Sequence, residues 1–404
     1  MWPEKKSDSF FASLAFKKIP SLAGIFIVAL ASLAIIFLVK KNTPPPFDIE
    51  VVSIEKPLQE ADQEDLAEEE EEMYVYPPVP ISMKKIKTQG CVADGILSSY
   101  GKDTDNSVDM INRSNCIYLH RALETWADAP NFEKASRIME RIQKPGLVYG
   151  MFIAEAIKIN KNYPNDKDED GNFDFRKMCR QGSENAWGEH TCKPELSSKE
   201  YRKYLTYITR RAMDLGIQSF LFGQIYYQDY EGPKKDRMKK VLEEMRAYAK
   251  EKKMQIIIGA QTGTIIDENY LRLFDYIEGG VGMGDDGFVE EGPCWSHLES
   301  CWALLWHDRY ASRANNVLLH FDWSGLMFDD MSVFARMEKH KRTEVLKRLH
   351  EYFTSKNMGF LLPMMATINK DNDGCRGPKK RFYSASNEYT CQDEGTINAI
   401  LSSQ

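Results

Sequence analysis

The chain has 404 residues, of which 43% are hydrophobic and 28% are charged, and its formal net charge is −7. This composition is typical of a globular protein with one large domain or two smaller ones. Twelve acidic residues and one lysine lie within residues 42–83, and the rest is close to neutral apart from lysines around an apolar segment. No concentrated basic face remains, so the composition excludes a nucleic-acid-binding protein.

Residues 21–39 (SLAGIFIVALASLAIIFLV) carry no charge. About 20 apolar residues span the hydrocarbon core of a bilayer, so we expect a single transmembrane helix here. Four lysines precede the segment and two follow it, which favours a cytoplasmic tail at residues 1–20 and an extracytoplasmic remainder. The alternative is a cleaved signal peptide, because Ala29–Ala31 resembles a cleavage site, but the apolar run continues to Val39.

Residues 40–88 are predicted to be a disordered linker. They contain prolines near both ends and an unbroken acidic run from Glu68 to Glu72. Such a segment cannot build a core and repels itself into an extended chain. We expect it to tether an extracytoplasmic domain, residues 89–404, to the cell membrane.

Eight cysteines follow the apolar segment, and no C-x-x-C motif is present. An even number of cysteines in an exported domain indicates structural disulfides. Proximity in the sequence favours four local pairs, which are Cys91 with Cys116, Cys179 with Cys192, Cys294 with Cys301, and Cys375 with Cys391.

The domain alternates between continuous apolar strands and helices. The expected strands are 147–153, 217–226, 255–260, 276–281, 317–323 and 359–365, with a further candidate at 93–99. The expected helices are in 115–143 and at 197–215, 235–252, 267–274, 295–312 and 341–356. Apolar runs without alternation are typical of parallel strands covered on both faces. The alternation of strands and helices predicts an α/β fold, a (β/α) TIM-like barrel that is irregular in places. The alternative is an open doubly wound sheet, although no G-x-G-x-x-G motif follows the first strand.

A barrel places its functional groups where its strands end and in the loops that follow. At these points the sequence has carboxylates, amides and one aromatic residue, which are Glu155, Asp229, Glu278, Asp322, Gln224, Gln261 and Trp323. The long segment 154–196 adds Trp187, which we expect to overhang the same face.

Carboxylate pairs beside aromatic side chains are typical of sugar hydrolysis, in which one group protonates the leaving oxygen and the other attacks or activates water. In architecture and residue types, residues 89–404 resemble the TIM-barrel glycoside hydrolases. The resemblance implies a glycosidase acting on cell-wall or surface polysaccharide, but it transfers no catalytic residue. From position alone we expect catalysis by Glu278 and Asp322, with Glu155 and Asp229 in reserve. Glycan binding is expected at Gln224, Gln261, Trp323 and Trp187.

Three alternatives remain open. Each carboxylate can be a buried, paired group without a catalytic role. The domain can bind carbohydrate or act as a surface scaffold without turnover, or it can be a metal-dependent hydrolase of another ester or amide. His320 and Asp322 offer two metal ligands, although a hydrogen-bonded core histidine is the commoner role for such a residue.

The stretch NDKDEDGNFDF (165–175) places carboxylates at alternate positions around a glycine. It resembles the calcium loops of EF-hand-like proteins, with Lys177 in place of the final glutamate. Hard oxygen donors that converge on a tight turn suit a structural Ca²⁺ ion, so we expect calcium here rather than a solvated acidic loop. The expected ligands are Asp166, Asp168, Asp170, Asn172 and Asp174. Residues 369–374 repeat this acidic pattern less completely, and there we expect an ordinary turn rather than a calcium site.

Overall fold

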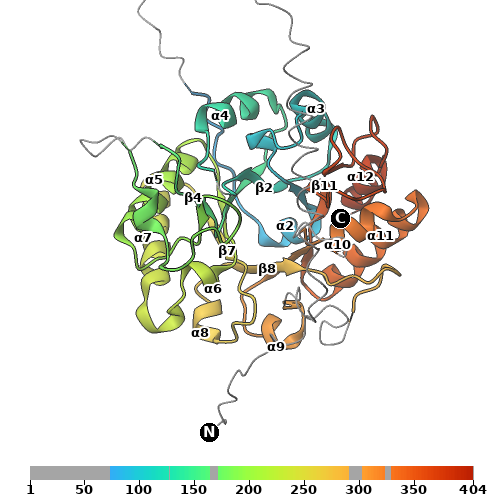
Figure 1. Cartoon of the computed structure of the whole chain (residues 1–404). Coiled ribbons are helices and arrows are strands. Elements are labelled where there is room, and N and C mark those ends of the chain that lie inside the picture. Colours follow the sequence, from blue (N-terminus) through green and yellow to red (C-terminus); the bar gives the residue numbers. More distant parts are fainter. Residues whose placement is uncertain (1–72, 127, 164–171, 291–302, 324–328, 404) are drawn as a thin grey trace, which may run out of the picture. The chain divides into compact units, whose positions relative to one another are not determined.

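The fold is a parallel barrel surrounded by helices, seen in a computed structural model that describes residues 73–126, 128–163, 172–290, 303–323 and 329–403 (Figure 1). The strands of the ring are β1 (Gly90–Ala93), β2 (Tyr118–Glu124), β3 (Val148–Ile153), β6 (Ser219–Phe222), β7 (Ile257–Ala260), β8 (Tyr276–Gly280), β9 (Val317–His320), and β10 (Gly359–Phe360) with β11 (Leu362–Thr367). Each strand pairs in parallel with its neighbour in this order. The predicted α/β barrel is therefore confirmed.

The ring closes through one interrupted strand. Gly359 pairs with Leu318 of β9, and Leu362 pairs with Cys91 of β1. Leu361, between β10 and β11, donates its backbone N–H to Leu319 O at 2.8 Å. The segment thus bridges the last and first strands and gives the described chain eight strand positions, as in a (β/α)₈ barrel.

A helix follows every strand position. In chain order these are α3 (Thr104–Arg113), α4 (Phe132–Arg141), α5 (Lys199–Asp214), α7 (Arg237–Glu251), α8 (Glu268–Leu271), α9 (Asp308–Ala311), α11 (Lys339–Ser355) and α12 (Glu394–Ser402). Shorter elements lie in the loops, namely η1 (Ile96–Ser98), β4 (Ile157–Lys158), η2 (Phe175–Met178), β5 (Thr191–Cys192), α6 (Ile225–Gln228), η3 (Gly232–Lys235), α10 (Asp330–Arg336) and β12 (Phe382–Ser384). Helices α8 and α9 have one turn each.

Helix α5 shows why the sequence predicted some of these helices well, although it missed α3 and α12. The Ser198 side chain accepts a hydrogen bond from Tyr201 N and caps the first turn. Residues buried at helical spacing, including Leu205 and Ile208, face the sheet. Gly216 ends the helix at a φ of 93°, a left-handed conformation that glycine adopts without strain.

The N-terminal ends of the strands are covered by residues 73–82, which we call the strap, and by helix α2 (Met83–Gln89). Ile86 of α2 belongs to the apolar cluster inside the barrel, together with Val92, Val148 and Leu221. Residues 73–88 were predicted to be the end of a linker, but they pack on the barrel. The strap and α2 are therefore part of the folded domain.

Other expectations from the sequence need correction. The region 115–143, expected to be helical, holds β2 before α4. The first strand is Gly90–Ala93 rather than 93–99. Within the expected helix 295–312, only Asp308–Ala311 is helical among the described residues. The expected strand 217–226 ends at Phe222, and a short helix takes over its last residues.

Disulfides join Cys91 to Cys116, Cys179 to Cys192, and Cys375 to Cys391, so three of the four local pairs are confirmed. Cys294 and Cys301 lie outside the described residues. The same holds for the transmembrane segment expected at 21–39 and for most of the expected linker. Among the described residues, none of the helices is both long and apolar enough to cross a membrane.

Candidate active site

A cavity of about 410 Å³ lies at the C-terminal ends of the barrel strands. Residues that follow different strands line it together. Its acidic lining residues are Asp94, Glu124, Glu155, Glu278 and Asp322; its aromatic ones are Tyr100, Trp126, Phe152, Trp187, Tyr226 and Trp323; and Arg121, Gln224, Gln261, Thr367 and Arg381 add further polar groups. The size suits a small ligand or one to two sugar rings of a longer chain.

Glu155 follows β3 and is buried. One of its carboxylate oxygens, Oε1, accepts a hydrogen bond from the Gln224 side-chain amide. The other oxygen, Oε2, has no hydrogen-bond partner among the described residues. A Cβ atom at Gly223 would lie 2.4 Å from Oε2, so glycine makes room for this carboxyl group. Burial raises the pKa of Glu155 to about 7.

Asp322 follows β9 and is partly exposed at the cavity. Its position is set by Asp330 of α10, whose Oδ2 accepts the backbone N–H of Asp322 at 3.1 Å and that of Val281 at 3.0 Å. Burial raises the pKa of Asp322 to about 8, with Asp329 and Asp330 adding like-charge repulsion. Asp330 thus ties the loops after β8 and β9 together and holds Asp322 at the cavity.

Glu155 and Asp322 lie on opposite sides of the barrel mouth. In the order around the ring, β8, β7 and β6 separate β9 from β3 on one side, and β10–β11, β1 and β2 separate them on the other. Because both residues line one cavity, a ligand that lies across the mouth passes between their carboxyl groups.

Strand β2 contributes a buried ion pair. Arg121 has a φ of 56°, at a register irregularity of the strand, and its Nε donates to Glu124 Oε1 at 2.5 Å. Such irregularities re-aim side chains next to sites. The guanidinium stacks between two rings, 3.8 Å from the centroid of Phe152 and 4.3 Å from that of Trp323. Arg121 thereby supports an aromatic wall of the cavity.

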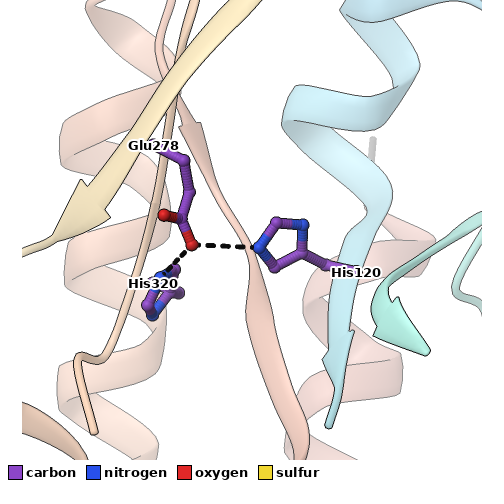
Figure 2. A group of neighbouring side chains, drawn as sticks. All are labelled: His120, Glu278 and His320. Atoms are coloured by element: carbon purple, nitrogen blue, oxygen red, sulfur yellow. Dashed lines mark hydrogen bonds and ion pairs between the residues drawn. The ribbon is translucent and has the colours of Figure 1, made fainter. Parts of the chain in front are cut away.

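Glu278 of β8 lines the cavity at its floor and contacts two buried histidines, and we call these three residues the floor cluster (Figure 2). Its Oε1 lies 3.0 Å from His120 Nε2 of β2 and also contacts His320 Nε2 of β9 as an ion pair. Strands β2 and β8 are opposite each other in the ring, so these inward side chains meet at the barrel centre. A layer of hydroxyl groups on Tyr118, Ser219 and Tyr276 extends from His120.

The three residues of the floor cluster shift one another's pKa values. Burial would raise the pKa of Glu278, but the neighbouring His320 and the hydrogen bond with His120 hold it well below its usual value. Burial opposes protonation of His320, yet the Glu278 carboxylate raises the pKa of that imidazole. Burial lowers the pKa of His120 to about 4, so this ring is neutral near pH 7. In the absence of any other ligand, Glu278 is thus ionised and paired.

The four residues expected to bind glycan all line the cavity. Gln261 Oε1 accepts the backbone N–H of Gln224 at 3.1 Å, which joins the two amides. Gln224 has a φ of 27°, a sparsely populated conformation that costs on the order of 1–3 kcal/mol. The Trp187 indole donates to Glu155 O at 3.2 Å and packs edge-on against Trp126. The segment 154–196 thus reaches the cavity, as expected.

Three of the four expected catalytic carboxylates line the cavity, and the fourth does not. Asp229 is buried elsewhere and accepts a hydrogen bond from Tyr270 at 2.9 Å. Its strand ends earlier than the sequence indicated, and helix α6 carries the chain away from the mouth before Asp229 is reached. Of the cavity carboxylates, Glu278 lies deepest and is already paired, which was the structural alternative stated for it.

The expected calcium ligands fall largely outside the described residues, including Asp166, Asp168 and Asp170. Asn172 and Asp174 are described. Asp174 caps η2, because its Oδ1 accepts the backbone N–H groups of Arg176 and Lys177. This use of the carboxylate competes with binding of an ion.

Sequence reasoning missed the residues that β2 brings to the site, namely His120, Arg121 and Glu124. A count of the strands would have found them, because a (β/α)₈ barrel has eight strands and therefore needs one between β1 and β3. Only the buried run YLHRALE lies in the right place. Asp94, at the end of β1, was also missed because the first strand had been placed too late in the chain.

No protein-family model matches the sequence, and no curated protein matches it. Solved structures are similar to parts of it. A β-L-arabinopyranosidase of Geobacillus stearothermophilus is 11% identical, with a TM-score of 0.42 over 70% of this chain and 72% of its own. A cyclic α-maltosyl-(1→6)-maltose hydrolase of Arthrobacter globiformis is 13% identical, with a TM-score of 0.44 over 78% of this chain and 76% of its own.

An α-galactosidase of Thermus thermophilus is 14% identical, with a TM-score of 0.41 over 80% of this chain and 63% of its own. At these identities the similarity concerns the fold, and it assigns no activity and no residue role to this chain. The resemblance to TIM-barrel glycoside hydrolases seen in the sequence was likewise one of architecture, and the closed ring of parallel strands agrees with that architecture.

Proposed function

We propose that this protein is a membrane-anchored, extracytoplasmic glycoside hydrolase that acts on cell-wall or surface polysaccharide. One observation carries the proposal: two carboxyl groups from opposite sides of the barrel, Glu155 and Asp322, line a single cavity with aromatic walls. Glycoside hydrolysis needs two carboxyl groups that flank the scissile bond, and aromatic faces hold sugar rings in place. The residues of the cavity themselves support this reading.

The contacts of Glu155 favour a role as nucleophile or base. The Gln224 amide donates to Oε1, and such a hydrogen bond stabilises the carboxylate form. The second oxygen has no partner among the described residues, so it is available to the substrate or to water. Asp322, across the mouth, is then the group that protonates the leaving oxygen. Glu278 is not needed for either role.

The decisive experiment compares full-length chains in detergent micelles on peptidoglycan and a panel of polysaccharides, with new reducing ends as the readout. We expect Glu155→Gln and Asp322→Asn each to lower the rate by about 10² to 10⁴-fold, the range of acid–base catalysis. Matched controls are Glu189→Gln and Asp105→Asn, whose side chains are 85% exposed. If Glu155 is the nucleophile or base, azide should cleave the glycan in Glu155→Gln with formation of a glycosyl azide, which is measured by mass spectrometry because it carries no reducing end.

Two outcomes would overturn the assignment. Turnover that survives both cavity substitutions would keep the activity and reject these two residues. Binding of a polysaccharide without release of reducing ends, from any glycan in the panel, would favour a non-catalytic carbohydrate-binding or scaffold protein.

The membrane location is part of the proposal. The uncharged segment 21–39 supports a single transmembrane helix, and three disulfides support an oxidising compartment for the barrel. Protease added to intact cells should degrade the barrel and leave the N-terminal tail protected. A barrel that is degraded only after the membrane is opened would place it on the cytoplasmic side.

Calcium binding by residues 166–174 also remains a proposal, supported by the alternation of acidic residues around Gly171. We expect millimolar Ca²⁺ to raise the melting temperature of the protein and Asp168→Asn to abolish the rise. An equal rise in the variant would reject this loop as the binding site.

A further inference from the structure

The cluster on the cavity floor has the composition of a metal centre. His120, Glu278 and His320 each offer one ligand atom, and these atoms all lie within 4.8 Å of one another. We propose that the Nε2 atoms of both histidines and the carboxylate of Glu278 bind one divalent transition-metal ion, of the Zn²⁺, Mn²⁺, Fe²⁺ or Co²⁺ class. This site is independent of the proposed glycosidase activity.

Three strands aim the ligand atoms at one point. Glu278 and His120 approach from opposite sides of the barrel, and His320 comes from the strand next to Glu278 (Figure 2). The side chains are 0%, 0% and 1% exposed, so packing fixes their orientation. Two imidazoles and one carboxylate form a ligand set that first-row transition metals favour, whereas Ca²⁺ and Mg²⁺ favour oxygen ligands alone. The site is therefore chemically distinct from the expected calcium loop.

The outer hydrogen bonds of both imidazoles fit metal ligation. His320 Nδ1 lies 2.8 Å from Phe321 O, and because a carbonyl oxygen only accepts, Nδ1 carries the proton. In the neutral ring, Nε2 then presents its lone pair to the cluster. His120 Nδ1 lies 2.8 Å from the Tyr118 hydroxyl, which can accept a hydrogen bond from the ring and donate one to Ser219. Metal-binding histidines are typically oriented by such hydrogen bonds on the second ring nitrogen.

Two buried atoms in the cluster lack hydrogen bonds. Glu278 Oε2 has no hydrogen-bond partner among the described residues. His320 Nε2 touches Glu278 Oε1, yet the contact does not have hydrogen-bond geometry. A buried polar atom without a partner costs about 1–3 kcal/mol. A cation between the three side chains would coordinate both atoms: it would remove this cost for Glu278 Oε2, and it would replace the ion pair of His320 Nε2 with a bond to the metal.

The ion would have a route to the site and room for further ligands. Glu278 lines the cavity, which extends from the floor to the barrel mouth. Protein donors fill three positions of the coordination shell, and an open position of this kind is typical of metal sites that bind water or substrate oxygen. The hydroxyl groups of a glycan in the cavity are oxygen donors of suitable chemistry.

The test measures metal content of the full-length chain in detergent micelles. The protein is stripped with EDTA, incubated with Zn²⁺, Mn²⁺, Fe²⁺ or Co²⁺ in turn, desalted and analysed by mass spectrometry of the elements. We expect about one equivalent of at least one of these ions in the wild type, and loss of most of it in His120→Asn, Glu278→Gln and His320→Gln. The matched control is His350→Gln, a buried histidine that bonds Thr88 O, which should retain the metal.

A measurement on the wild type guards against variants that fail to fold. Loading with Co²⁺ should produce visible d–d absorption bands, and the bound ion should raise the melting temperature until EDTA is added. Wild-type protein that keeps its circular dichroism but binds none of the four ions would overturn the proposal. So would metal content that is unchanged in all three cluster variants. Absence of glycan cleavage would reject only the proposed function, since metal content is measured without substrate.

Discussion

The two ends of the barrel treat buried polar groups in opposite ways. At the N-terminal end, the Gln218 side chain bonds both N–H and C=O of Val79 in the strap, at 2.8 and 2.9 Å, and Gln255 O at 2.8 Å. At the C-terminal end, one carboxylate oxygen of each of Asp94, Glu124, Glu155 and Glu278 has no hydrogen-bond partner among the described residues. The amide groups under the strap are thus paired, although the buried Tyr149 hydroxyl there is not, and the mouth holds several carboxylate oxygens that are free to bind a ligand.

This difference indicates that the N-terminal end of the barrel contributes mainly to stability and the C-terminal end mainly to function. Satisfied amides and apolar side chains under the strap stabilise the barrel. Unsatisfied carboxylates at the mouth destabilise it, and such strain is typical of sites that bind or catalyse. Substitutions at the N-terminal end should therefore lower stability and leave the chemistry intact. Substitutions of the carboxylates at the mouth should instead impair the chemistry and leave stability unchanged or raise it.

The largest effect on stability is expected from Tyr76→Ala in the strap. The Tyr76 ring packs edge-on against Tyr149, and its hydroxyl accepts from Leu147 N at 2.9 Å. Removal of a buried aromatic side chain should lower the free energy of unfolding by about 4 kcal/mol. Urea denaturation followed by circular dichroism measures this, with Tyr76→Phe as a control that loses only the hydroxyl, at about 1 kcal/mol. If Tyr76→Ala unfolded at the wild-type urea concentration, the strap would have no role in closing the barrel.

The next effect is a pH dependence at the mouth, from Glu155. Its pKa is raised from 4.5 to about 7 in the folded protein. As the pH rises above 4.5, the unfolded chain releases this proton first, so stability falls until about pH 7 and then levels off. The full penalty is about 3 kcal/mol.

The Glu155→Gln variant has no proton to lose at this position. We therefore expect its free energy of unfolding, relative to that of the wild type, to increase as the pH rises from 4.5 to 7. Urea titrations across this range measure the difference. The matched control is Glu189→Gln, at an exposed glutamate. A difference that stays constant with pH would mean that Glu155 ionises normally in the folded state.

A smaller effect is expected from Gly216→Ala, where the strap crosses the end of α5. Gly216 has a φ of 93°, and an added Cβ would lie 2.0 Å from Tyr76 O. We expect a loss of about 2 kcal/mol from strain and displacement of the strap. Gly146→Ala is the matched control, because Gly146 has a φ of 77° but an open space around its Cβ. Equal melting temperatures of the two variants would argue against the close contact.

The smallest effect is expected from Gln255→Ala. The Gln255 side chain accepts the backbone N–H of Ile81 at 2.9 Å in an exposed part of the strap. Loss of one such hydrogen bond should cost about 1 kcal/mol. Hydrogen exchange at Ile81 should accelerate, while exchange at Val79, which bonds Gln218, should change little. Unchanged exchange at Ile81 would show that this bond does not hold the strap in solution.

Local patterns in the sequence predicted much of this molecule. Continuous apolar runs indicated the parallel strands from β3 onward, since such runs are buried on both faces. Ser198 and Gly216 bounded α5 because capping acts within a few residues. Cysteines close in sequence predicted the three described disulfides. The carboxylates at strand ends were expected to meet because all parallel strands of a barrel end at one face.

Strand β2 was not predictable in the same way. Its residues, including Ala122, Leu123 and Glu124, favour helices, and its extended conformation comes from pairing with β1 and β3 on either side. Tertiary context outweighed the local preference. The error hid His120 and Arg121, so neither the floor cluster nor the aromatic wall supported by Arg121 could be seen from the sequence.

The sequence by itself determined the class of fold and the residue types at the barrel mouth, because both follow from short-range periodicity. Only the tertiary structure decided which of these residues meet. His120 and Glu278 are 158 residues apart, and they touch because closure of the barrel places β2 opposite β8. Register and closure depend on pairings across the whole chain. For this reason the same carboxylate that looked catalytic in the sequence lies between two imidazoles in the fold.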